Sequence, residues 1–263
     1  MNQPTTPAIA AILEAAGRDI LMPAFVQRNK TNSDKSDGSV VTETDLTCQQ
    51  HIQTQLAQSW PDIDFLGEEM TTEEQTACLQ RGGRFWCLDP LDGTTNFVAS
   101  FPAFGLSLAL VEDNRPALAC IVDPVRGETF SATTGHGASI NGSAVHAKSV
   151  SKLSEAVGFV DFKRLDANRR GLLATPGLYR SQRNIGSCAL EWAWLAAGRA
   201  QFIVHGGEKI WDFAAGGLIA IEAGCTLTDF KGGSVLDCMQ PVSPILATAS
   251  VELHETLSHI VRS

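Results

Sequence analysis

The chain has 263 residues, of which 44% are apolar and 19% are charged, a composition typical of a globular protein rather than a disordered one. At this length the chain can bury a large core without disulfide or metal staples. Its net charge of −9 argues against nucleic acid as a partner, because phosphate backbones are bound through an excess of Lys and Arg. An acidic protein that handles phosphate usually needs a cation between its carboxylates and the phosphate.

The cysteines and the apolar segments indicate the compartment. The seven cysteines are odd in number, scattered, and nowhere arranged as C-x-x-C, which disfavours both a disulfide framework and a zinc ribbon. The N-terminus has no basic segment followed by an apolar one, and no apolar run approaches the roughly 20 residues of a membrane span. We therefore expect a cytoplasmic protein that does not bind membranes.

The first part of the chain predicts helices that alternate with strands. Pro7 follows two threonines and precedes apolar residues at helical spacing, which predicts an amphipathic helix to about Arg28. Residues 29–39 are polar and without periodicity, so we expect a loop there. A second amphipathic helix is expected to start near Asp45 and to end before Trp60. The segments that follow are predicted as a strand at 63–67, a helix at 72–80 and a strand at 84–88.

From residue 104 onward we expect antiparallel strands, after which the chain returns to α/β alternation. Turn residues separate three apolar segments, a pattern typical of a meandering sheet. His254 and His259 lie on the last predicted helix; at roughly 100° per residue they point away from each other, and both are predicted to be exposed. The predicted strands lie at 104–111, 117–122, 128–132, 156–160, 179–185 and 200–204, with two more within 225–248, and the predicted helices lie at 166–174, 187–199, 211–224 and 252–262.

Residues 86–97 send an apolar segment directly into two carboxylates. Asp89 and Asp92 are three residues apart, and Pro90 restricts the backbone between them. Two hard oxygen ligands on a tight turn suit a divalent cation such as Mg²⁺. Gly93, with two threonines after it, offers backbone N–H groups to a phosphate. For this segment alone the alternative is an ordinary β-turn, in which both carboxylates accept backbone hydrogen bonds.

Three other carboxylates stand where they could reach the same point. Asp45 lies at the start of a predicted helix, Glu68 at the end of a predicted strand, and Asp212 in the first turn of the helix at 211–224. Each has a structural alternative, since acidic residues commonly cap helices or lie near their N-terminal dipoles. No one of the three identifies a metal site by itself.

Taken together, the acidic segments resemble the inositol monophosphatase family of magnesium-dependent, lithium-sensitive phosphatases. They stand in the family's order between about residues 30 and 230. The resemblance implies an α/β (α+β) fold, a layered αβαβα sandwich in one domain over 1–263, with halves of about 1–148 and 149–263. It also implies a cytoplasmic homodimer that hydrolyses phosphate monoesters. The matching segments are V-V-T-E-T-D ending at Asp45, G-E-E with Glu68, W-C-L-D-P-L-D-G-T-T-N-F with Asp89 and Asp92, and W-D-F-A-A-G-G with Asp212.

The resemblance assigns two to three Mg²⁺ ions to these carboxylates. Glu68, Asp89 and the backbone carbonyl of Leu91 would hold the first ion. Asp89, Asp92 and Asp212 would hold the second, and Glu68 would contribute to a weaker third. Two metals close together can stabilise both the phosphoryl oxygens and the leaving alkoxide of a reaction that is very slow in water.

The catalytic residues implied by the resemblance are Asp45, Glu68 and Thr94. A water activated by a metal, by Glu68 and by the Thr94 hydroxyl would attack phosphorus directly, while Asp45 orients Thr94. The N–H groups of Gly93 and Thr94 would bind the phosphate. The D-x-x-D spacing favours direct attack by water, since a phosphatase that forms an aspartyl-phosphate would carry D-x-D.

The alcohol side of the substrate is expected to meet a different set of residues. Cys188 stands where alanine is frequent in the family, and His205 stands where many inositol-specific members have an acidic residue. Glu208 is the alternative contact at this place and would need a loop shift. The substrate-binding residues carried over are Asp92, Gly93, Thr94, Gly186, Ser187, Cys188, His205 and Asp212.

Inositol monophosphate is the predicted substrate, hydrolysed to inositol and phosphate. The segment at 35–39 also resembles relatives that act on histidinol phosphate or on 3′-phosphonucleotides, and fructose bisphosphate is a further alternative. A different class of function is a regulatory interaction protein that keeps the fold. The complete set of predicted metal carboxylates favours the enzyme.

Overall fold

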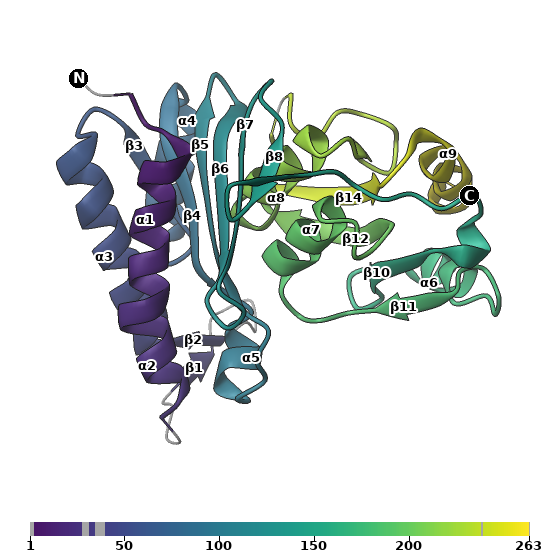
Figure 1. Ribbon diagram of the computed structural model, residues 1–263, viewed down its shortest axis with the longest axis horizontal. Coiled ribbons are helices and arrows are strands. Elements are labelled where there is room, and N and C mark those ends of the chain that lie inside the picture. Colours follow the sequence, from purple (N-terminus) through teal and green to yellow (C-terminus); the bar gives the residue numbers. More distant parts are fainter. Residues whose placement is uncertain (1–2, 28–31, 35–39, 238, 263) are drawn as a thin grey trace.

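The computed structural model describes residues 3–27, 32–34, 40–237 and 239–262. Two β-sheets alternate with three layers of helices, so that the chain forms an αβαβα sandwich (Figure 1). The predicted fold class and layering are therefore confirmed. Within the described residues no helix is both long and apolar enough to cross a membrane.

The first layer of helices covers the outer face of the first sheet. Apolar residues such as Ile9 and Leu13 are fully buried against strands of that sheet. The predicted N-terminal helix is interrupted by a π-helical turn at Gly17–Leu21, a local irregularity without a signal in the hydrophobic spacing. The layer comprises α1 (Thr6–Ala16), α2 (Met22–Phe25) and α3 (Glu43–Ser59).

The first sheet has seven strands in the order β3-β4-β5-β6-β7-β8-β9. β3 and β4 are parallel and joined by helix α4 (Thr72–Arg81), and every later neighbour is antiparallel. The meander and the cover on both faces agree with the sequence prediction. The strands are β3 (Asp64–Gly67), β4 (Arg84–Asp92), β5 (Gly105–Glu112), β6 (Arg115–Asp123), β7 (Glu128–Thr133), β8 (Ala138–Ile140) and β9 (Ser143–Val145).

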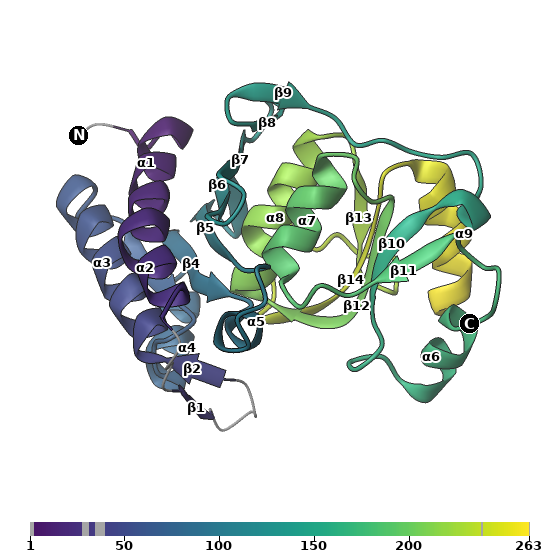
Figure 2. The same ribbon diagram turned by 60° about the horizontal axis from the view of Figure 1, so that its bottom comes forward.

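Two helices, α7 (Cys188–Ala196) and α8 (Ile210–Glu222), fill the space between the sheets (Figure 2). Their close approach depends on Gly216, because a Cβ atom added there would lie 2.4 Å from the Cβ of Trp192. Trp192 is fully buried, so it is a core residue of this layer. Besides this contact with α7, α8 packs against β4, β5 and β6 of the first sheet.

The second sheet has the strand order β11-β10-β12-β14-β13. β10 is parallel to both β11 and β12, while β14 is antiparallel to β12 and β13. Helices α6 and α9 form the last layer on its outer face (Figure 2). The elements are β10 (Val157–Asp161), α6 (Ala167–Leu173), β11 (Ser181–Arg183), β12 (Phe202–Lys209), β13 (Thr226–Thr228), β14 (Val242–Thr248) and α9 (Val251–Arg262), with a 3₁₀ turn at Leu153–Glu155 and the short helix α5 (Thr94–Val98) after β4.

Two sequence predictions need correction. Part of the expected loop at 29–39 is a strand, because β1 (Asn32–Asp34) pairs antiparallel with β2 (Val40–Thr42); residues 28–31 and 35–39 lie outside the described residues. The exposed position predicted for His254 is wrong, because its ring packs against the second sheet and its Nε2 lies 2.9 Å from Thr228 Oγ1.

Candidate active site

Strand β4 extends four residues beyond its predicted end and carries the two central carboxylates. Its pairing with β5 is regular up to Asp89, then shifts before it resumes at Asp92. The irregularity is a β-bulge, within which the backbone N–H of Leu91 donates to Asp89 Oδ1 at 2.9 Å. Gly93 then adopts φ = 94°, and a Cβ atom there would lie 3.0 Å from the carbonyl oxygen of Ala103. The chain therefore needs glycine at this turn.

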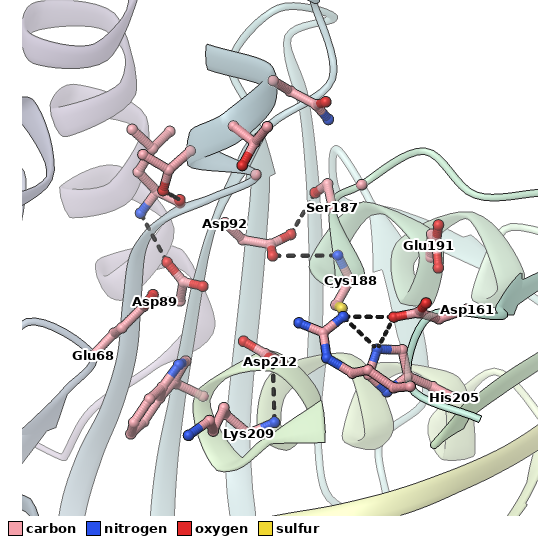
Figure 3. A pocket seen from close by; sticks show the side chains of 18 of the residues that line it. Glu68, Asp89, Asp92, Asp161, Ser187, Cys188, Glu191, His205, Lys209 and Asp212 are labelled. Carbon is pink, nitrogen blue, oxygen red and sulfur yellow. Dashed lines mark hydrogen bonds and ion pairs between the residues drawn. The ribbon is translucent and has the colours of Figure 1, made fainter. Parts of the chain in front are cut away.

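Asp212 reaches the two β4 carboxylates from the other half of the chain. Oxygen atoms of Asp89, Asp92 and Asp212 all lie within 4.8 Å of one another. Asp212 is in the first turn of α8 and accepts a hydrogen bond from the backbone N–H of Lys209. Glu68 lies beside this group at the pocket wall, just after β3, where its backbone N–H donates to the carbonyl of Leu88 at 3.1 Å (Figure 3).

The electrostatics of this group fit a bound divalent cation. Burial raises the pKa values of Asp89 and Asp212 well above the usual range for a carboxyl, and repulsion from Glu68 and Asp92 acts in the same direction on both. Burial also raises the pKa of Asp92 to about 6, against the lowering effect of hydrogen bonds from Ser187 and the backbone. Among the described residues, no basic side chain forms an ion pair with the three aspartates. Buried carboxylates without such a partner are the donor set that Mg²⁺ prefers.

Asp45 and Thr94 form a hydrogen-bonded pair next to the carboxylates. Thr94 Oγ1 lies 2.9 Å from Asp45 Oδ1 and 3.0 Å from the carbonyl oxygen of Leu91. The other carboxylate oxygen of Asp45 accepts from the backbone N–H and the hydroxyl of Thr42, which completes a capping box at the start of α3. Asp45 is therefore the third residue of a capping box, whose N-cap is Thr42, and a hydrogen-bond partner of Thr94, so its capping contacts leave it in place for the predicted role.

The N-terminus of α7 is attached to Asp92. The Ser187 hydroxyl and the backbone N–H of Ala189 donate to Asp92 Oδ2, and the N–H of Cys188 donates to Oδ1 at 3.2 Å. Gly186 precedes this turn and lines the same pocket. The residues predicted to line the alcohol side are thus brought next to the carboxylates, from a segment almost 100 positions further along the chain.

His205 and Glu208 occupy different environments. His205 lines the pocket and its Nε2 lies 3.0 Å from Asp161 Oδ2. Glu208 is buried, accepts a hydrogen bond from the Trp192 indole at 2.8 Å and does not line the pocket. The β-bulge in β12 adds one residue between them, so that His205 and Glu208 lie on the same face with ligand atoms within 4.8 Å of each other, and of the two His205 lines the cavity.

Sequence reasoning missed several residues of the pocket, which has a volume of ≈ 730 Å³. Asp161 is the last residue of β10, and Lys163 and Arg164 come two and three residues after it. Their signal was their place after a strand of the second sheet, since parallel strands bring their carboxyl ends to one edge. Figure 3 shows Asp161 and His205 on one side, Glu68 and Asp89 on the other, and Asp92 and Asp212 between them.

Comparison with known proteins identifies relatives along the whole chain. A family model described as the inositol monophosphatase family matches residues 1–263. The chain is 31% identical to a Xylella fastidiosa protein named Nus factor SuhB, over 100% of this chain and 96% of that one. It is 35% identical to the fructose-1,6-bisphosphatase/inositol-1-monophosphatase of Thermotoga maritima, over 76% of each. A solved structure of a Thermotoga maritima IMPase has a TM-score of 0.83 and 30% identity, and the match covers 96% of this chain and 94% of that one.

Proposed function

The chain belongs to the inositol monophosphatase family and is a phosphoric monoester hydrolase, and we propose that it cleaves small phosphate monoesters with Mg²⁺ as its cofactor. The observation that carries the proposal is the convergence of Asp89, Asp92 and Asp212 within 4.8 Å, the first two buried and the third half-buried, without a basic partner among the described residues. Inositol monophosphate is the reference substrate, since a relative's name includes inositol-1-monophosphatase.

We assign the metal ligands as the sequence motifs do. Asp89, Asp92 and Asp212 would hold one ion, and Glu68, Asp89 and the Leu91 carbonyl another. Bound there, the ions would supply positive charge to the phosphoryl and leaving oxygens and would acidify a water. Two or three divalent ions would also offset the repulsion that raises the pKa values of the buried aspartates.

The residues of the chain would position the attacking water and the phosphate. When Thr94 donates its hydroxyl proton to Asp45, the lone pairs of Thr94 Oγ1 are left to accept a proton from a water. Glu68, at the pocket wall, is the second acceptor that this water could meet. The N–H groups at Gly93 and Thr94 begin α5, where the first N–H groups have no partner within the helix and can bind a phosphate oxygen.

A regulatory role without catalysis is the weaker candidate. It is favoured by one relative's name, Nus factor SuhB. Against it, the chain keeps every carboxylate of the proposed metal sites as well as Thr94. We further propose a cytoplasmic homodimer, which light scattering coupled to gel filtration would test for the subunit number.

The proposal is tested by phosphate release from inositol 1-phosphate at a series of Mg²⁺ concentrations. We expect turnover that requires Mg²⁺, and Asp92→Asn should lower kcat/KM by more than about a hundredfold, because a metal carboxylate supplies several kcal/mol to such a reaction. The matched control is Asp62→Asn at an exposed site, which should leave kcat/KM unchanged. Turnover without Mg²⁺, or near-normal activity of folded Asp92→Asn, would contradict the assignment.

A further inference from the structure

Arg164 lies with Asp161 and His205 on the side of the pocket opposite Glu68 and Asp89 (Figure 3). Lys163 and Arg164 follow β10 and both line the cavity, whereas Lys209, which ends β12, lies beside Asp212 at the metal end. Among the described residues, neither lysine forms an ion pair with a carboxylate. Arg164 and Lys163 thus bring positive charge to the wall of the pocket that follows β10.

Arg164 has donors that the described residues do not use. Its Nη1 lies 2.5 Å from Asp161 Oδ2 and 3.4 Å from His205 Nε2, whereas its Nε and Nη2 atoms have no hydrogen-bond acceptor within the described part of the chain. Half of the side chain, 52%, is exposed. A guanidinium presents five donors in a planar fork that matches a carboxylate or a phosphate, so one edge of Arg164 is available to an anion in the pocket.

A short series of contacts connects Arg164 to the reacting end of the pocket. The backbone N–H of Cys188 donates to Asp92. The sulfur of Cys188 lies within 4.8 Å of a ring nitrogen of His205, and His205 in turn contacts Arg164. Arg164 thus lies two side chains beyond a proposed metal ligand, at the place where the alcohol half of a phosphate monoester would extend.

The carboxyl groups on this side of the pocket do not cancel the basic charge. Asp161 is already engaged by Arg164, His205 and the N–H of Lys163. Burial raises the pKa of Glu191 to about 8, so that it is largely uncharged at neutral pH. Among the described residues at this end, Asp161 and Glu191 line the pocket and both accept hydrogen bonds from the chain, while Glu208 is buried behind His205 and accepts from the Trp192 indole.

A cation is a poor alternative occupant of this end. Cys188, His205 and Glu208 offer ligand atoms within 4.8 Å of one another, a mixed set that would suit a transition metal. However, the guanidinium of Arg164 lies 3.4 Å from the imidazole of this set, and its permanent positive charge would repel the ion. The same charge attracts an anion.

We propose that the preferred substrates carry a second anionic group, a carboxylate or a phosphate, on the alcohol half of the molecule, and that Arg164 binds this group with Lys163 near it. The inference rests on the proposed phosphatase function and narrows its substrate class. It disfavours histidinol phosphate, whose alcohol half carries positive charge, and it ranks inositol monophosphate below phosphate esters of the same size that bear a second anion.

The test compares pairs of esters that differ in the second anion. Glycerol 3-phosphate and 3-phosphoglycerate differ by a carboxylate, and fructose 1-phosphate and fructose 1,6-bisphosphate differ by a phosphate. For the wild-type protein with Mg²⁺ we expect kcat/KM to be about tenfold to a hundredfold higher for the anionic member of at least one pair, as for a charge-assisted hydrogen bond. The pair with the larger ratio distinguishes a carboxylate from a phosphate. Ratios of one or below in both pairs would overturn the proposal.

Variants of Arg164 show whether this residue causes the preference. Arg164→Gln should lower the ratio at least about fivefold, whereas Arg164→Lys, which keeps the charge, should retain part of it. Arg170→Gln is the matched control, because it removes one positive charge from an exposed position of α6 outside the pocket; its ratio should equal that of the wild type. An unchanged ratio in folded Arg164→Gln would refute the role of Arg164.

A binding measurement tests the anion preference independently of phosphatase activity. Dissociation constants of the same ester pairs are measured by calorimetry with Ca²⁺ in place of Mg²⁺, for the wild type and for Arg164→Gln. Absence of turnover with every ester would count against the proposed function, while the ratio of dissociation constants still decides the anion preference. Equal dissociation constants within both pairs would overturn the inference even in an active phosphatase.

Discussion

Replacement of Asp45 by asparagine separates the two roles of this residue. Asp45 Oδ2 accepts from the backbone N–H of Thr42, at 2.9 Å, and from its hydroxyl, while Oδ1 faces Thr94 Oγ1 at 2.9 Å. A backbone N–H can only donate, so in Asp45→Asn the amide oxygen must stay toward Thr42 and the amide NH₂ must face Thr94. The Thr94 hydroxyl would then accept from residue 45, and its proton would turn to the Leu91 carbonyl 3.0 Å away.

The reversed hydrogen bond between residue 45 and Thr94 should lower the rate of phosphate release strongly and the free energy of unfolding only slightly. With asparagine at position 45, the Thr94 hydroxyl can no longer donate its proton to a carboxylate, so its lone pairs are no longer available to accept a proton from a water. The hydroxyl proton turns instead to the Leu91 carbonyl, which is proposed as a metal ligand. Loss of a positioned proton acceptor typically costs about 10²–10⁴ in rate. The capping box is only weakened, so the free energy of unfolding should fall by about 1 kcal/mol or less.

A second capping box supplies the matched control. At the start of α4, Glu74 accepts from the backbone N–H and the hydroxyl of Thr71 in the same way, on an exposed surface. Glu74→Gln should therefore lower stability by a similar amount and leave phosphate release unchanged. Steady-state phosphate release and urea unfolding are measured on both variants. If Asp45→Asn and Glu74→Gln retained the same kcat/KM, Asp45 would be a helix cap without a role in catalysis.

Three further outcomes follow from the structure. Li⁺ should inhibit phosphate release at fixed Mg²⁺ by competing for the carboxylate sites, and complete indifference in a Li⁺ titration would count against the proposed metal sites. Gly216→Ala should lower the free energy of unfolding, measured in urea, by about 1–3 kcal/mol, because the new Cβ would meet Trp192 at 2.4 Å. The control is Gly171→Ala, whose new Cβ would have no neighbouring atom within 4 Å, and which should leave the free energy of unfolding unchanged or raise it. Burial lowers the pKa of His254, so below about pH 6.5 the unfolded chain binds a proton before the folded chain does, and the free energy of unfolding falls. His254→Gln should therefore make the urea midpoint less sensitive to pH between 7 and 5.5. If the variant and the wild type were equally sensitive, this histidine would not contribute to the pH dependence.

The sequence predicted the layers and the carboxylate group because both depend on local patterns. Hydrophobic spacing defines most of the helices and strands, and the acidic residues stand in short motifs whose order identifies the family. The boundaries that failed depend on pairing with distant residues. β4 continues to Asp92 because that residue pairs with Gly105 of β5, and a strand forms within the polar segment at 32–34 because it pairs with 40–42.

The alcohol side was harder to predict because its residues are assembled across the second sheet. Asp161 and His205 are register partners on the parallel strands β10 and β12, and no local pattern announces that pairing. The buried position of His254 was missed for a related reason, since it depends on contact between α9 and the threonines of β13 and β14. In both cases the sheet topology, rather than the residue type, decides what the side chain meets.

The hydrogen bonds between the N-terminus of α7 and Asp92 explain why residues at the alcohol end of the pocket can be substituted more freely than those at the carboxylate end. Cys188 and Ala189 hold Asp92 through backbone N–H groups, which any residue except proline supplies, so the side chain at position 188 can vary without disturbing the carboxylate. Ser187 is the exception, because its hydroxyl makes the contact. Beyond this turn, His205 and Arg164 do not contact the aspartates of the proposed metal sites in the described hydrogen bonds. The contacts of Asp92 can thus be kept intact while the charge around His205 and Arg164 changes, so we expect the proposed metal motifs to specify the reaction and residues outside them to select the substrate.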